Sequence, residues 1–198
     1  MRAALTFDVE HPDAPCPPGV VDAILAALAR GGVRGTFFLQ GRWVRSQPNE
    51  ARRIVAAGHL VGNHSHHHAP MDALTDDGFR GDVREAEQII DRVTGADPRP
   101  WFRCPFGSGM EDPRVLGLIA ELGYRHVGWD VDPKDWDVRR DAATVEAAVV
   151  DGVLGREADS VVLMHGWPGV TAEALPRIVE RLIDSGAELV AVDALLAD

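Results

Sequence analysis

The stretch Ala-Ala-Leu-Thr-Phe-Asp-Val-Glu, residues 3–10, places a mainly apolar run directly before two carboxylates. Residues 17–32 then carry apolar side chains at helical spacing and end in two glycines, where a left-handed helix cap fits. A second short apolar run follows at residues 36–39. This succession of strand, helix and strand is typical of a sheet wrapped by helices.

The same alternation continues to the C-terminus without an internal repeat or a linker. About seven such units with short connections favour one α/β domain spanning residues 1–198, built as a barrel of parallel strands. An open doubly wound sheet is the alternative. The pattern predicts further strands at residues 60–61, 101–102, 124–129, 161–164 and 189–192, and helices at residues 47–57, 76–93, 113–123, 144–154 and 171–185.

The composition excludes several classes of protein. With 198 residues, 45% of them hydrophobic and 26% charged, the chain has the make-up of one globular domain. The net charge is −11 and Lys134 is the only lysine, so nucleic acid is not an expected partner. No segment reaches the length of about 18 apolar residues that a membrane span needs, and no signal-peptide stretch precedes Asp8, so we expect a cytoplasmic protein. Cys16 and Cys104 are too few for a disulfide framework and are interpreted as reduced thiols. The sequence offers no basis for predicting the oligomeric state.

Polar side chains follow several of the predicted strands. Because barrels and open α/β sheets bind ligands beyond the carboxyl ends of their strands, these residues are candidates for a functional site. Each has a structural explanation as a cap, a turn or a surface residue, but their concentration at one end of the fold favours a shared site. They are Asp8, Glu10, His64, His66, His67, His68, Arg103, Asp130, Asp132, Asp135, Trp136 and His165.

Half of the eight histidines fall within residues 64–68. If this segment is a helical turn, His64 and His68 lie on one face, the spacing of histidine pairs that bind one divalent metal. His66 and His67 would then point elsewhere. An exposed histidine cluster without a metal is the competing interpretation, and a third ligand would decide between them.

A carboxylate from the end of the first strand is the expected third ligand. In an extended chain Asp8 and Glu10 project to one side and Val9 to the other, so one could bind metal while the other acts as a base. Two histidines and one carboxylate leave positions open for water and substrate, as hydrolytic metal sites require. His165 is placed to protonate the leaving group.

Five short segments, in this order, match motifs of one known family. They are Thr6-Phe7-Asp8, His64-Ser65-His66-His67-His68, Arg103-Cys104-Pro105-Phe106, Asp132-Pro133-Lys134-Asp135-Trp136 and Leu163-Met164-His165. Through them the chain resembles the NodB-type polysaccharide deacetylases, also called carbohydrate esterase family four. The stretches at residues 32–38 and 57–63 also fit, so the resemblance extends from about residue 3 to the last strand.

The resemblance implies a distorted (β/α) barrel of the NodB-homology type and a metal-dependent hydrolase that removes acetyl groups, usually from N-acetylated sugars. By the same resemblance, Asp8 is the general base and His165 the general acid. Arg103 would orient Asp8 and keep it ionised, and Asp132 would pair with His165 or Arg103 to tune its proton affinity.

The resemblance also implies the binding residues. His64 and His68 would bind one divalent metal, with zinc as the default for two histidines and a carboxylate and cobalt, nickel or manganese as alternatives. Phe106 belongs to the motif that lines one side of the groove, and Trp136 and Leu163 would form a small apolar pocket for the acetyl methyl group.

One residue departs from the family's pattern. The first motif usually holds two adjacent aspartates, of which the second binds the metal, but here Val9 stands in that second place. Glu10 is the replacement we predict, because the extra methylene of glutamate can restore the reach of the carboxylate. If Glu10 is not a ligand, Asp8 itself or a water would have to complete the site.

The leading hypothesis is a metal-dependent deacetylase acting on an N-acetylated sugar, an oligosaccharide or a small sugar-containing metabolite. An O-acetyl esterase or a linear or cyclic amidase of the same fold is the first alternative, because a fold does not determine the substrate. A carbohydrate-binding pseudoenzyme, in which Val9 marks a lost metal ligand, is the second. Cys104 also allows a nucleophile, but no histidine is predicted beside it, and a structural thiol is the preferred interpretation.

Overall fold

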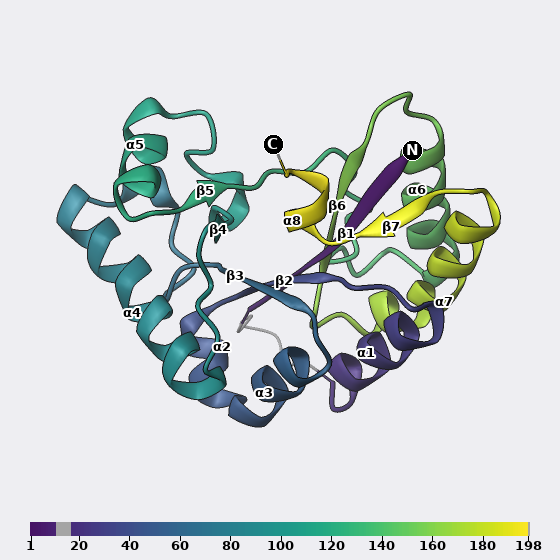
Figure 1. Ribbon diagram of the computed structural model, residues 1–198, viewed down its shortest axis with the longest axis horizontal. Coiled ribbons are helices and arrows are strands. Elements are labelled where there is room, and N and C mark those ends of the chain that lie inside the picture. The colour runs from purple at the N-terminus through teal and green to yellow at the C-terminus, as the bar shows by residue number, and fades with distance from the viewer. Residues whose placement is uncertain (11–16, 198) are drawn as a thin grey trace.

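The computed structural model describes residues 1–10 and 17–197 and shows a curled parallel sheet with helices packed around its outside (Figure 1). Cys16 lies outside the described residues. The strands are β1 (Arg2–Val9), β2 (Thr36–Leu39), β3 (Leu60–Asn63), β4 (Trp101–Phe102), β5 (Arg125–His126), β6 (Ser160–His165) and β7 (Glu188–Val190). The helices are α1 (Val20–Gly31), α2 (Gly41–Ser46), α3 (Pro48–Ala56), α4 (Asp76–Thr94), α5 (Pro113–Glu121), α6 (Ala142–Leu154), α7 (Gly169–Asp184) and α8 (Val192–Leu195), with short 3₁₀ turns at Met71–Ala73 and Pro105–Gly107.

The seven strands form one sheet, in which six follow the order β5-β4-β3-β2-β1-β6 and β7 pairs with β1, and every pairing between them is parallel. β1 is central, because it pairs with β6 on one side and with both β2 and β7 on the other. β7 pairs with Arg2 to Ala4 of β1, and β2 pairs with Thr6 to Val9 of the same strand. The sheet therefore divides along β1. The prediction of a distorted barrel of mostly parallel strands is confirmed, and the open doubly wound alternative is set aside.

The strand predicted at residues 124–129 is shorter than expected. Only Arg125 and His126 form β5, which pairs with β4. The residues that follow then leave β4 and approach β6. Val127 N–H donates to the Phe102 carbonyl oxygen at 2.8 Å, whereas Val131 forms an isolated bridge with Val162. One segment therefore joins both edges of the curled sheet, and it cannot remain a regular strand while it changes partners.

The helix ends follow the sequence signals. α1 closes at Gly32, whose φ of 64° requires the left-handed conformation that glycine adopts without strain. α4 begins at a Thr75 cap, and α5 begins with Pro113 after an Asp112 cap. Two short helices were not predicted: α2, which Gln47 separates from α3, and α8, which begins at Val192 where a closing strand was expected to end. Both are too short for helical periodicity to show in the sequence.

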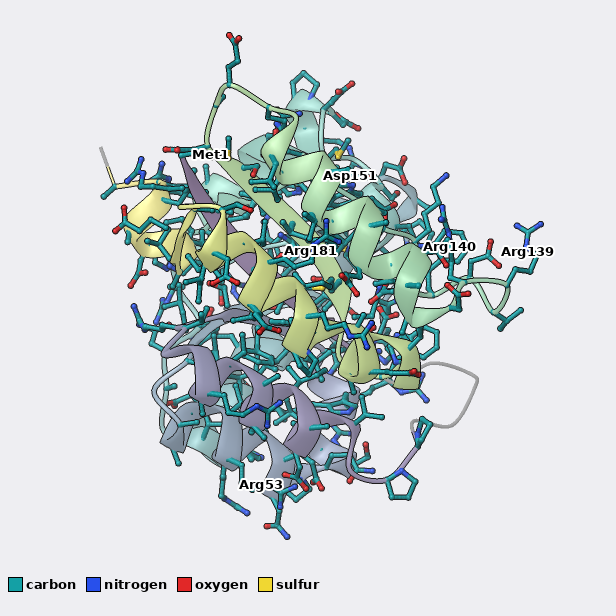
Figure 2. All side chains as sticks on the ribbon, turned by 90° about the vertical axis from the view of Figure 1, so that its right-hand side faces the viewer. Met1, Arg53, Arg139, Arg140, Asp151 and Arg181 are labelled. Carbon is teal, nitrogen blue, oxygen red and sulfur yellow. The ribbon has the colours of Figure 1, made fainter. Side chains whose placement is uncertain are left out.

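The main core lies between the sheet and the helices. It is built from the apolar side chains of β1, β2 and β6 and the inner faces of α1, α6 and α7. α7 packs against both α1 and α6, and the three helices lie side by side over this face (Figure 2). Arg139, in the loop before α6, extends away from the helices at the edge of the same view. Within residues 1–10 and 17–197, no helix has both the length and the apolar character needed to cross a membrane.

Candidate active site

Side chains at the end of β1 alternate between the apolar core and the cavity. Val9 is fully buried in the main core, whereas Asp8 and Glu10 point to the cavity beyond the strand ends and are 4% and 8% exposed. The predicted same-side projection of the two carboxylates is therefore present. Gly166, after β6, allows this packing, because a Cβ there would lie 2.9 Å from Val9 Cγ2.

Arg103 holds Asp8 from inside the barrel. Its Nη1 donates to Asp8 Oδ1 and to Thr6 Oγ1, each at 2.8 Å, and its remaining donors bind the Val127 and Gly128 carbonyl oxygens at 3.1 Å. The guanidinium lies over the Phe38 ring at 4.2 Å and is fully buried. Burial lowers the pKa of Arg103, and the Asp8 carboxylate opposes that shift. This charge-assisted pair fixes Oδ1 of Asp8 and leaves Oδ2 facing the cavity.

Residues 64–68 do not form a helical turn, the condition under which the sequence placed His64 and His68 on one face. Ser65 and His68 adopt left-handed backbone conformations with φ of 61° and 58°, so the segment is an irregular turn. The Asn63 side chain accepts from Ser65 N–H at 2.8 Å, and the Ser65 hydroxyl accepts from His68 N–H at 3.1 Å. This ligand turn, residues 64–68, still brings the two expected imidazoles together, because its own side chains bind its backbone.

Glu10, His64 and His68 form a compact group of potential metal ligands at the end of the sheet. Their facing atoms are the His64 and His68 Nε2 atoms, 3.2 Å apart, and Glu10 Oε2, which lies 3.6 Å from His64 Nε2 and contacts His68 Nε2. Zinc bonds of about 2.0–2.1 Å would set two tetrahedral ligands about 3.3 Å apart, close to the separations of His64 Nε2 from His68 Nε2 and from Glu10 Oε2, so the group could hold one divalent ion.

A hydrogen bond and the local charges orient and ionise the members of this ligand group. His64 Nδ1–H donates to the Arg103 carbonyl oxygen at 2.9 Å, which leaves the Nε2 lone pair directed at the other two donors. Burial opposes ionisation of Glu10, but the adjacent imidazoles of His64 and His68 outweigh it and hold the pKa of Glu10 far below its usual range. Glu10 is therefore an ionised carboxylate beside two imidazoles, as a metal ligand must be.

His66 and His67 point away from this group, as the sequence predicted. They form a second cluster with Glu85 on the outside of the ligand turn. His66 Nε2 lies 3.2 Å from Glu85 Oε1, the same oxygen that Arg45 contacts at 2.9 Å. His67 Nδ1 bonds to Asp82 at 2.7 Å. Because an arginine cation already shares Glu85, the group inside the cavity is the better candidate for a metal.

Asp135, not Asp132, is the partner of His165. Asp135 Oδ1 accepts from His165 Nδ1 at 2.7 Å, while Oδ2 accepts from His165 N–H at 2.7 Å and from the Thr171 hydroxyl at 2.6 Å. Asp132 instead accepts from the Lys134 backbone N–H at 2.8 Å. The predicted pairing of Asp132 with His165 or Arg103 is therefore wrong, although Asp132 does line the cavity.

The environment of His165 favours the protonated ring. Burial opposes protonation, but the hydrogen bond and charge of Asp135, with the nearby carboxylates of Asp8 and Glu10, raise the pKa of His165 to about 9. At neutral pH the imidazole carries a proton on Nε2 that it can donate, since Nδ1–H is held by Asp135.

One cavity of about 490 Å³, a size typical of small-molecule sites, is lined by Asp8, His165 and the ligand group Glu10, His64 and His68. The predicted substrate-binding residues Phe106, Trp136 and Leu163 all line it. Phe106 and Trp136 are 70% and 47% exposed, whereas Leu163 is buried. The full lining is Asp8, Glu10, His64, His68, Phe106, Trp129, Asp132, Trp136, Leu163, His165 and Trp167.

Cys104 takes no part in this site. Its side chain packs in an apolar cluster, and burial, with a smaller contribution from Asp72, raises the pKa of the thiol to about 12. A thiol that stays protonated at neutral pH is a poor nucleophile, so Cys104 is a structural residue.

Three residues near the site were not assigned a role by the sequence. Asp135 stood among the polar residues after the strand at residues 124–129 but was not chosen over Asp132. Asp82 interrupts the apolar face formed by Phe79 and Val83, and a buried carboxylate on such a face is a detectable signal. Trp167 donates from its indole to Glu10, and nothing in the local pattern distinguishes it from a core tryptophan.

Comparison with known proteins gives a consistent result. A family model described as polysaccharide deacetylase matches residues 2–127. A peptidoglycan-N-acetylglucosamine deacetylase of Bacillus cereus is 32% identical over 200 residues, which cover 98% of this chain and 68% of that protein.

Solved structures agree with the sequence match. A family 4 carbohydrate esterase from Streptomyces lividans, in complex with acetate, superimposes with a TM-score of 0.81 and 31% identity, covering 95% of this chain and 91% of that one. A CE4 family pseudoenzyme from Bacillus anthracis reaches a TM-score of 0.85 with 29% identity, covering 98% of this chain and 65% of that one. On the family model, the sequence identity and the shared fold together, this chain belongs to the polysaccharide deacetylase family.

Proposed function

We propose that this protein is a metal-dependent hydrolase that removes the acetyl group from N-acetylated sugar units. The observation that carries the proposal is that Asp8, His165 and the group Glu10, His64 and His68 all face one cavity. A pseudoenzyme that only binds carbohydrate has no need of this combination. The relatives named as peptidoglycan deacetylases support an oligosaccharide or polymer substrate, in addition to the small sugar metabolite expected from the sequence.

Glu10, His64 and His68 would hold the divalent ion, with zinc as the first choice. When bound there, the ion supplies Lewis acidity to the acetamide carbonyl and to the attacking water. The nitrogen-rich ligand set also allows cobalt, nickel or manganese.

The proton transfers belong to Asp8 and His165. Asp8 Oδ2 accepts the proton of the attacking water, since Oδ1 is held by Arg103. His165 Nε2–H donates to the departing amine nitrogen, and Asp135 stabilises the ring before and after the transfer. An amide needs this acid more than an ester does, because an unprotonated amine anion is a very poor leaving group.

The cavity walls orient the acyl group. Leu163 is buried, Trp136 is partly exposed and both line the cavity, which suits a methyl group in a small apolar recess. The Phe106 ring packs edge-on against His68 at 4.4 Å between centroids, and it presents its exposed face to a sugar ring. The cytoplasmic location expected from the sequence stays a prediction.

The test is acetate release by protein first stripped with a chelator and then reloaded with zinc, cobalt, nickel or manganese. Substrates are N-acetylglucosamine oligomers, peptidoglycan fragments and matched O-acetyl sugars. Metal-dependent release from an N-acetyl substrate is the expected result. Release from O-acetyl sugars alone would replace the proposal with an esterase, and sugar binding without hydrolysis under any metal would replace it with a pseudoenzyme.

A further inference from the structure

Trp167 lies beside Glu10 because of the register between β1 and β6. Asp8 pairs with His165 in this parallel ladder, and Gly166 N–H continues it by donating to the Asp8 carbonyl oxygen at 2.9 Å. Glu10 and Trp167 are each two residues beyond the paired Asp8 and His165. Their side chains meet at the rim of the cavity, where Trp167 Nε1–H donates to Glu10 Oε1 at 3.0 Å.

The two oxygens of the Glu10 carboxylate therefore have different partners. Oε2 faces the imidazoles of His64 and His68, whereas Oε1 is held by the indole of Trp167. An indole N–H is a donor without acceptor capacity, so it selects the ionised carboxylate and cannot compete for the metal. The hydrogen bond assigns one oxygen to support and leaves the other for the ion.

This support matters because residue 10 is a glutamate. Glutamate has one more rotatable bond than aspartate, so fixing its carboxylate costs more side-chain entropy. Glu10 also lies just past the end of β1, where no ladder pairing restrains it. A hydrogen bond from a partly buried tryptophan offsets both disadvantages.

We propose that Trp167 is a positioning residue that orients Glu10 as a metal ligand and so makes glutamate workable at this place in the site. The inference rests on the proposed function, because it takes Glu10, His64 and His68 as the metal site. Hydrogen-bonding partners of metal ligands typically change metal affinity by about 10–100-fold when removed.

Trp167→Phe removes the N–H donor and keeps an aromatic ring against His165, which Trp167 contacts edge-on at 5.9 Å between centroids. The measurement is titration of the metal-stripped protein with Co²⁺, followed by its visible absorption. We expect affinity for Co²⁺ to fall about 10–100-fold. Trp129→Phe is the matched control, since Trp129 lines the same cavity from another loop, and it should bind Co²⁺ like the wild type.

A double-mutant cycle separates positioning of Glu10 from a general effect on the cavity. In Glu10→Asp, the shorter carboxylate cannot reach both the indole and the imidazoles, so adding Trp167→Phe should cost little further affinity. Strong coupling between the two positions is the expected result. Equal losses from Trp167→Phe in both backgrounds would overturn the proposal, because the effect would then not pass through Glu10.

The same titration distinguishes failure of the role of Trp167 from failure of the proposed function. If the wild type binds Co²⁺ and Trp167→Phe binds it equally well, Trp167 does not position the ligand, and the proposed function stands. If the wild type binds no Co²⁺ and releases no acetate with any metal, the proposed function and the role of Trp167 both fail.

Discussion

The raised pKa of His165 depends on Asp135, a residue that lies 30 positions earlier in the chain. Asp135 accepts from both the ring and the backbone N–H of His165, and Thr171 fixes the second carboxylate oxygen. Because Asp135 is buried, its charge acts on the imidazole through little intervening water. A general acid with a raised pKa stays protonated over the neutral range, which suits the release of an amine.

Asp135→Asn should move the alkaline limb of the pH profile of kcat/KM to lower pH. In the proposed mechanism the general acid must be protonated, so activity should be lost as pH rises through the His165 pKa of about 9. Without the Asp135 charge, burial dominates and lowers that pKa, and the limb should move by about 1–3 pH units. Asp132→Asn is the control and should leave the position of the limb unchanged. A limb that moves with Asp132→Asn instead would show that the structural assignment of the partner is wrong.

The buried ion pair of Arg103 and Asp8 should make a measurable contribution to the free energy of unfolding. Removing one partner of a buried ion pair leaves the other charge uncompensated, at a cost of about 3–5 kcal/mol. Arg103→Met should lower the free energy of unfolding in urea by about that amount. Arg156→Met, which breaks the surface pair with Asp130, should change it by less than about 1 kcal/mol. Equal effects of the two substitutions would contradict the buried role of Arg103.

At the level of elements, two neighbouring helices, α2 and α4, hold the ligand turn by hydrogen bonds. The first turn of α2 donates Gly41 N–H to the Ser65 carbonyl oxygen at 2.9 Å, and only glycine fits there, because a Cβ would lie 2.4 Å from His66 Nδ1. From α4, the Asp82 carboxylate accepts from the backbone N–H groups of His66 and His67 at 2.8 and 3.1 Å. The irregular turn is therefore ordered by helices that do not contact the substrate cavity.

Asp82→Ala should loosen the ligand turn without touching a metal ligand. Two backbone N–H groups and the His67 ring would lose their acceptor, and each buried unsatisfied donor costs about 1–3 kcal/mol. We expect weaker Co²⁺ binding and faster amide hydrogen exchange at residues 64–68, measured by mass spectrometry. Asp91→Ala, on an exposed turn of the same helix, is the control. Unchanged exchange in Asp82→Ala would exclude α4 as the support of the turn.

At the level of the whole molecule, the ligand group joins strands that are distant in sequence. Glu10 follows β1, and His64 and His68 follow β3, with β2 between these strands in the sheet. An ion bound by all three would link parts of the barrel that separate on unfolding. Metal binding should therefore stabilise the folded state by mass action.

Zn²⁺ at about 100 times its dissociation constant should add about 2.7 kcal/mol of stability. For a chain of this size, that corresponds to a rise in Tm of about 5–10 °C in a thermal scan. Glu10→Ala should abolish most of the rise, whereas Glu85→Gln, in the outer histidine cluster, should keep it. A rise that survives Glu10→Ala and disappears in Glu85→Gln would move the metal to the outer cluster.

Much of the fold could be predicted because its signals are local. Apolar runs, helix periodicity and glycine or proline boundaries identified most strands and helices and the parallel barrel class. The misses occur where tertiary pairing overrides the local pattern. The segment after β5 leaves β4 to bridge Val162 on β6, and the chain turns into α8 at Val192 where a strand was expected.

The sequence by itself determined which residues could carry chemistry and at which strand ends they stand. Alternation along β1 was enough to put Asp8 and Glu10 on one side and Val9 in the core, because side-chain direction in a strand depends only on position parity. Only the tertiary structure decided the partners: Asp135 for His165, Trp167 for Glu10 and Asp82 for the ligand turn. Each of these contacts depends on the register and packing of elements far apart in the chain. Local sequence patterns do not predict which of these distant elements come into contact.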